Sequence, residues 1–130
     1  MNIVIDTNII ISAIISTRGN PYKILSLITN DESIRVYYSN EILNEYKRVL
    51  AYKRLNIPVE TQIDILAKIK QFGILVEPTA STIPLPDETD RVFYDTAQAS
   101  GAILITGNTK HYPTEPFIMP ATDFIKYIET

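Results

Sequence analysis

The stretch that decides the fold is Ile3-Val4-Ile5-Asp6-Thr7-Asn8, near the start of the sequence. Three successive aliphatic residues predict a short strand that is buried on both faces, as the central strands of parallel sheets are. The polar residues Asp6, Thr7 and Asn8 end that strand. In open α/β sheets the functional site lies beyond the carboxyl ends of the strands. Asp6 therefore has two interpretations, either a turn or capping residue before the next helix or a functional carboxylate.

Outward from this strand, short apolar runs alternate with longer segments of helical periodicity. The predicted strands are 34–38, 74–77, 102–106 and 117–119, and the predicted helices are 9–15, 20–28, 39–50, 58–72, 87–100 and 121–128. Asn20 is the expected cap of the second helix. In helix 58–72, the predicted inward residues are Ile63, Leu66, Ile69 and Phe72. The alternation predicts a single domain, 1–130, with a three-layer α/β/α fold and a central, mostly parallel sheet of about five strands.

Composition argues against several classes of protein. The sequence contains no cysteine, which rules out disulfides and thiolate zinc sites, and no apolar run approaches the roughly 18 residues that span a bilayer. The net charge of −3 argues against a protein that coats nucleic acid non-specifically, so any contact with RNA must be local. The residues after Met1 do not resemble a signal peptide, and we expect a cytoplasmic protein with no membrane partner.

Two further acidic residues lie where their helices are expected to approach the sheet. Glu45 lies about 110° from the centre of an apolar stripe near Tyr46, so its carboxylate can reach toward the sheet or pair with a neighbouring lysine. Asp90 shares a helical face with Phe93, and a carboxylate facing the core costs several kcal/mol unless it is paired or bound to a metal. Asp87 is expected on the same side, where helix capping is the alternative role.

Carboxylates that converge on one point repel each other and raise one another's pKa values. A hard divalent cation relieves this repulsion, and Mg²⁺ suits sites that combine a few carboxylates with water and substrate phosphate. Such a site supports hydrolysis of a phosphodiester. If positions 6, 45 and 90 converge, the sequence predicts a hydrolase of this kind. A haloacid-dehalogenase-type phosphatase is not favoured, because it requires an aspartate where this chain has Asn8.

Four segments occur in an order and spacing that resemble a known family: IVIDTN at 3–8, SNEILNEY at 39–46, DETDRVF at 87–93 and TGNTKH at 106–111. They resemble the PIN-domain ribonucleases, and among these the VapC-like toxins of toxin–antitoxin pairs. The resemblance implies catalytic metal ligands and supporting residues at matching positions. These are Asp6, Glu45 and Asp90 as catalytic ligands, Asp87 as a further ligand, and Asn8, Thr106 and Asn108 as supporting residues.

The resemblance implies an endoribonuclease that cleaves single-stranded RNA with Mg²⁺ or Mn²⁺ as cofactor. It also implies neutralisation by a small antitoxin protein and assembly as a homodimer. Because Asn108 is neutral where many family members have an acid, the alternative is a catalytically weakened domain that binds RNA or protein.

His111, the only histidine, is expected in a polar loop, where solvation or phosphate contact is favoured over general-base catalysis. The basic residues expected to contact RNA phosphates are Lys47, Arg48, Arg91 and Lys110.

Overall fold

The computed structural model describes residues 1–130, which form six α-helices and five strands. The strands are β1 (Asn2–Ile5), β2 (Arg35–Tyr38), β3 (Ile74–Leu75), β4 (Ile103–Ile105) and β5 (Ile118–Met119). The helices are α1 (Thr7–Ile15), α2 (Asn20–Asn30), α3 (Asn40–Leu50), α4 (Val59–Phe72), α5 (Arg91–Ser100) and α6 (Ala121–Glu129). Short 3₁₀ turns cover 53–55, 88–90 and 109–111. None of the helices combines the length and apolar character that crossing a bilayer requires.

The five strands form one parallel sheet in the order β3-β2-β1-β4-β5. β1 lies at the centre, and its residues Ile3, Val4 and Ile5 are fully buried, as predicted. The chain adds β2 and β3 on one side of β1, then returns to add β4 and β5 on the other. Ile5 pairs with Ile105 of β4, so both strands end at the same level. The crevice beyond these carboxyl ends is the point where the strand order reverses, which is where open α/β sheets bind ligands.

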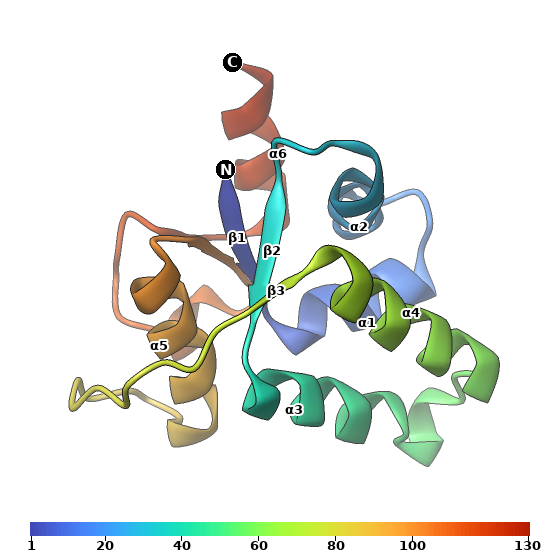
Figure 1. Cartoon of the computed structure of the whole chain (residues 1–130), viewed down its shortest axis with the longest axis horizontal. Helices are drawn as coiled ribbons and strands as arrows, with labels where there is room; N and C mark the ends of the chain where they lie inside the picture. Colours follow the sequence, from blue (N-terminus) through green and yellow to red (C-terminus); the bar gives the residue numbers. More distant parts are fainter.

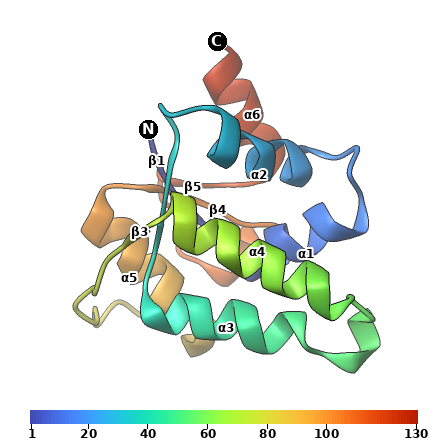
Figure 2. The ribbon, with the colours of Figure 1, turned by 45° about the vertical axis from the view of Figure 1, so that its right-hand side comes forward.

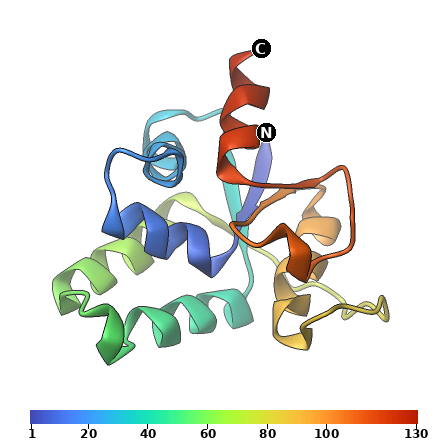
Figure 3. The same cartoon turned by 180° about the vertical axis from the view of Figure 1, so that it is seen from behind.

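Helices cover both faces of the sheet (Figure 1). α5 packs on one face, against β1, β2 and β4, while α1, α2 and α4 lie on the opposite side (Figure 3). α3 follows β2 and runs side by side with α4 (Figure 2). This arrangement confirms the predicted three-layer α/β/α fold, with a sheet that is parallel throughout.

Three predicted helix starts differ from the structure. The first helix begins at Thr7, two residues earlier than predicted, so Thr7 lies in its first turn beside the end of β1. The cap of α2 is Gly19, and Asn20 is already helical. The segment predicted to open a helix at Asp87 forms a 3₁₀ turn instead, and α5 begins at Arg91. Each difference concerns the local conformation at a helix end, which periodicity does not define.

α4 buries fewer residues than its periodicity predicted. Ile69 is buried, but Ile63 and Phe72 are 60% and 39% exposed. The helix packs on α2 and α3 and approaches the sheet near its carboxyl end, where Gly73 lies against the ring of Tyr38. A Cβ at Gly73 would lie 2.3 Å from the carbonyl oxygen of Ile69 and 2.8 Å from the Tyr38 ring, so this close approach requires glycine. The apolar stripe of α4 is therefore covered only in part.

Candidate active site

Three predicted carboxylates from distant parts of the chain line one pocket of about 380 Å³. Asp6 follows β1, Glu45 lies on α3, and Asp90 ends the 3₁₀ turn before α5. The pocket lies beyond the carboxyl ends of β1 and β4. Its other polar lining residues are Thr7, Asn8, Ser12, Arg54, Asp87, Asn108 and His111. Positions 6, 45 and 90 thus line one pocket, and their roles as metal ligands stay a prediction.

Asp6 is held by the residues that follow β4. Its Oδ2 accepts hydrogen bonds from the hydroxyl of Thr106 and the hydroxyl of Tyr112, each at 2.8 Å. Burial of the side chain raises the pKa of Asp6, and these two hydrogen bonds oppose that rise. Asp6 precedes α1, yet its side chain makes no capping hydrogen bond to the helix. Asp6 thus occupies the N-cap position of α1 through its backbone, while its carboxylate is held by Thr106 and Tyr112.

Glu45 points to the same pocket from α3. The next residue, Tyr46, is fully buried and donates a hydrogen bond to the carbonyl oxygen of Ile5, which fixes α3 against the end of β1. Thr7 donates a hydrogen bond of 2.5 Å to Glu45 Oε2. Burial raises the pKa of Glu45, the charge of Asp6 adds to that rise, and the Thr7 hydroxyl opposes it. Glu45 thus faces Asp6 across the start of α1.

Asp87 and Asp90 enter the pocket from the turn before α5. Asp87 caps that turn, as its alternative role predicted, by accepting hydrogen bonds from the backbone N–H and the hydroxyl of Thr89 at 3.0 and 2.8 Å. The side chain of Asp90 is only 13% exposed, and Phe93 on its face is fully buried. Burial, followed by the negative charges of Asp6 and Asp87, raises the pKa of Asp90 to about 6. Asp90 is therefore a carboxylate placed against like charges.

His111 completes this side of the pocket, because its Nδ1 lies 3.1 Å from Asp90 Oδ2. One ligand atom from each of Asp87, Asp90 and His111 lies within 4.8 Å of the other two. Ligands bound about 2.1 Å from one octahedral ion lie about 3 to 4 Å apart, which is close to this spacing. The donor set, two carboxylates and an imidazole beside two further carboxylates, therefore fits a divalent cation.

Hydrogen bonds join the loop after β4 to the residues that follow β1. Thr106 donates to Asp6 and also accepts a hydrogen bond of 3.0 Å from the backbone N–H of Asn108. Asn8 Oδ1 accepts a hydrogen bond of 2.8 Å from the backbone N–H of Gly107. The three predicted supporting residues thus lie close together. Asn8 and Asn108 line the pocket, and Thr106 is buried and holds Asp6.

A model of the PIN domain family matches residues 2–110, a range that includes every lining residue of the pocket except His111. The chain belongs to the PIN domain family. This PIN domain is 37% identical over 111 residues to the uncharacterized protein MJ1680 of Methanocaldococcus jannaschii, an alignment that covers 83% of this chain and 71% of that protein. No solved structure matches it significantly. PIN domains are generally nucleases that use divalent metals, so the acidic pocket has the composition expected of a nuclease-type fold.

The basic residues near the pocket of the PIN domain differ in their surroundings. Lys47 and Lys110 are exposed, and their contact with RNA stays a prediction. Arg48 lies 3.6 Å from Glu45 and packs over the ring of Tyr52. Arg54, which follows α3, lines the pocket itself. Positive charge is therefore present at the α3 side of the site, next to an otherwise acidic surface.

Arg91, also predicted to contact RNA, binds the protein's own loop instead. Its guanidinium donates hydrogen bonds to the carbonyl oxygens of Ser81 and Ile83 at 2.9 and 2.6 Å, and it pairs with Glu88 at 2.7 Å. Asp95, buried on α5, accepts a hydrogen bond from the backbone N–H of Ser81. Arg91 does not line the pocket. The structure therefore favours a role in holding loop 79–86 rather than a phosphate contact.

Two residues at the site were not predicted to act there. His111 was expected in a solvated loop, and Tyr112 was one of eight tyrosines without a pattern. The 3₁₀ turn at 109–111 folds the chain back, so that His111 lines the pocket beside Asp90 and the buried Tyr112 contacts Asp6. The only signal in the sequence was their closeness to Asn108, which already belonged to the predicted site.

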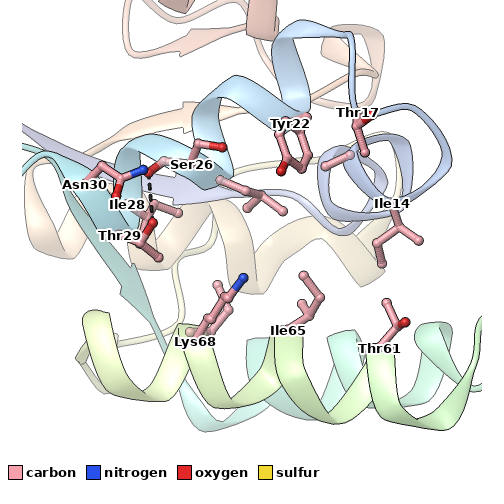
Figure 4. A pocket seen from close by; sticks show the side chains of 13 residues that line it. Ile14, Thr17, Tyr22, Ser26, Ile28, Thr29, Asn30, Thr61, Ile65 and Lys68 are labelled. Atoms are coloured by element: carbon pink, nitrogen blue, oxygen red, sulfur yellow. Dashed lines mark hydrogen bonds between the residues drawn. The ribbon is translucent and has the colours of Figure 1, made fainter.

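A second hollow, also of about 380 Å³, has a different character (Figure 4). It lies between α2 and α4, and Ile65 and Lys68 point from α4 toward α2. Seven of its 13 lining residues are hydrophobic, and none is an aspartate, glutamate or histidine. It therefore lacks the groups that hydrolysis requires, and the acidic pocket is the candidate active site.

Proposed function

We propose that this PIN domain is a divalent-metal-dependent endoribonuclease that cleaves single-stranded RNA. The observation that carries the proposal is the meeting of Asp6, Glu45 and Asp90 in one pocket at the strand-order reversal. The pKa values of all three are raised, chiefly by burial, and the charge of Asp6 adds to the rise at Glu45 and Asp90. A cation shared by these carboxylates offsets their repulsion.

In this proposal the protein's residues hold and orient the acids. Asp6, Glu45 and Asp90 bind the ion directly, and Asp87 and Asn108 contribute beside them. Thr7, Thr106 and Tyr112 fix the carboxylates of Glu45 and Asp6 through the hydrogen bonds described above. Bound Mg²⁺ or Mn²⁺ supplies an activated water and neutralises charge on the transferring phosphoryl group. No protein nucleophile is required.

RNA as substrate is supported by the form and charge of the site. The pocket is open to solvent on one side of the sheet edge, where a phosphodiester of a flexible strand has access. Arg54 lines the pocket and Arg48 lies beside Glu45, so cationic groups are available for neighbouring phosphates. The net charge of −3 limits such contacts to this local patch.

A toxin role, with neutralisation by a small antitoxin protein and assembly as a homodimer, extends the proposal. It is supported by the likeness to VapC-like toxins in the four segments that build the pocket. Growth arrest on induced expression, relieved by Asp6→Asn, is the expected outcome in a bacterial host. Sedimentation of the purified chain would show whether it forms a dimer.

The decisive experiment is an RNA cleavage assay on a labelled single-stranded RNA with Mg²⁺, Mn²⁺ or EDTA. We expect internal cleavage with either ion, none with EDTA, and none in Asp6→Asn or Asp90→Asn. The control is Asp123→Asn, an exposed acid on α6 that does not line the pocket. Binding of the RNA without cleavage in either ion would support the alternative of a catalytically weakened binding module.

A further inference from the structure

His111 and Asn108 form a polar pair on one wall of the acidic pocket. The ring nitrogen Nδ1 lies 3.1 Å from Asp90 Oδ2, and the amide nitrogen of Asn108 lies 3.0 Å from Nε2. The imidazole is therefore held on two sides, by a carboxylate and by a neutral amide. Its side chain is 44% exposed, so it is reached from the open pocket.

The distances from the imidazole to the neighbouring carboxylates are those expected of ligands that share one metal ion. Two atoms bound at right angles to one octahedral ion, each about 2.1 Å from it, are about 3 Å apart. The separation of Nδ1 from Asp90 Oδ2 matches this value, and a carboxylate oxygen of Asp87 completes the group within 4.8 Å. When Nδ1 binds an ion, Nε2 carries the ring proton and requires a hydrogen-bond acceptor. The amide nitrogen of Asn108 lies 3.0 Å from Nε2, so a turn of this amide that exchanges its nitrogen and oxygen supplies that acceptor.

We propose that His111 is a nitrogen ligand of the metal ion, positioned by Asn108, and that it makes the site select Mn²⁺ over Mg²⁺. The proposal rests on the proposed metal-dependent function. Mg²⁺ demands oxygen ligands and gives up water reluctantly. Mn²⁺ also suits carboxylates, but as a first-row transition ion it accepts an imidazole nitrogen more readily than Mg²⁺ does. One nitrogen among four carboxylates therefore shifts the site toward Mn²⁺.

The first test is the direct detection of nitrogen bound to Mn²⁺. Electron spin-echo modulation of the Mn²⁺-loaded protein should show a ¹⁴N coupling from a directly bound ring. The coupling should disappear in His111→Ala and persist in Lys110→Ala, a neighbouring exposed residue of the same turn. Circular dichroism of each variant establishes that it is folded.

The second test compares the two ions by titration calorimetry. The wild-type protein should bind Mn²⁺ about tenfold or more tightly than Mg²⁺. His111→Ala should lose about tenfold or more of the affinity for Mn²⁺ and little of that for Mg²⁺. Two variants add an oxygen ligand, His111→Asp in place of the nitrogen and Asn108→Asp beside it. Both should reduce the ratio of the two affinities by raising binding of Mg²⁺.

The outcomes separate this inference from the function on which it rests. If neither ion binds the wild-type protein, the proposed function and the inference both fail. Binding of both ions without a ¹⁴N coupling, or with equal losses for both in His111→Ala, would assign His111 to orienting Asp90 and overturn its role as a ligand. A coupling together with a selective loss of Mn²⁺ supports it.

Discussion

The hydroxyl of Thr106 donates a hydrogen bond of 2.8 Å to Oδ2 of Asp6, which joins the residue after β4 to the residue after β1. The pairing of Ile5 with Ile105 brings the two strands to the same level, so the next residue of each lies beside the other. Tyr112 donates to the same oxygen from the following loop. Both hydroxyls bond Oδ2, so they orient the carboxylate through this one oxygen.

Tyr112→Phe tests this orientation with little change of shape. The hydroxyl is lost while the buried ring remains, so the free energy of unfolding should fall by about 1.5 to 3 kcal/mol, the usual value of a hydrogen bond to a charged group. The pKa of Asp6 should rise further, and affinity for Mn²⁺ should fall about tenfold. Urea unfolding and metal titration measure the two effects. Tyr127→Phe, at a position 54% exposed on α6, should change neither.

Asp90→Asn should stabilise the metal-free protein at neutral pH while abolishing cleavage. The pKa of Asp90 is raised from 3.8 to about 6, so the folded protein holds this proton more tightly than the unfolded chain does. The carboxyl therefore reduces stability as pH rises from about 4 to 6, and the loss persists above that range. Its size is on the order of 1 to 2 kcal/mol. Asparagine carries no charge, so Asp90→Asn avoids this loss of stability.

Urea unfolding in EDTA at pH 4.5 and pH 7.5 measures this difference. The wild-type protein should lose more stability between the two pH values than Asp90→Asn does, and Asp123→Asn should behave as the wild type. Added Mn²⁺ should stabilise the wild type and leave Asp90→Asn almost unchanged. An identical pH dependence in all three proteins would mean that Asp90 does not oppose its neighbours as the geometry indicates.

The fold was predictable because the apolar runs, the helical periodicity and their alternation along the chain all indicated the same arrangement. The aliphatic run Ile3–Ile5 has no polar residue, which only a strand covered on both faces tolerates. Where the prediction of buried residues was wrong, the cause was tertiary. Ile63 and Phe72 follow the helical period of α4, yet they remain 60% and 39% exposed. Periodicity shows which face is apolar and cannot show how much of it is packed.

The site was predictable where a side chain lies on a regular element and not where a loop carries it. Asp6 follows a strand and Glu45 lies on a helix, so their directions follow from geometry. His111 and Tyr112 reach the site through a single 3₁₀ turn whose course no spacing rule defines. Arg91 was placed near RNA because it adjoins Asp90, but the path of loop 79–86 gave its guanidinium carbonyl partners.

Arg91→Lys should loosen loop 79–86 and, through it, the turn that carries Asp87. Lysine keeps the charge but lacks the planar set of donors that reaches both Ser81 and Ile83. We expect faster hydrogen exchange and easier proteolysis within the loop, together with weaker binding of metal. Arg18→Lys serves as the control for the same exchange at an exposed position outside the pocket. Unchanged exchange in the loop, combined with a loss of affinity for RNA, would restore Arg91 as a phosphate contact.

Thr7→Val should move the pH dependence of cleavage to higher pH. Thr7 is buried in the first turn of α1, and its hydroxyl is the hydrogen-bond donor that opposes the raised pKa of Glu45. Valine has nearly the same shape and no donor, so the pKa of Glu45 should rise and the ionised form should require a higher pH. At pH 6.5 affinity for Mn²⁺ should fall about tenfold and recover in part at pH 8. Thr7→Ser keeps the hydroxyl and should follow the wild-type profile, because the donor rather than the methyl group acts on Glu45. Equal pH profiles for the valine and serine variants would show that Glu45 does not depend on this contact.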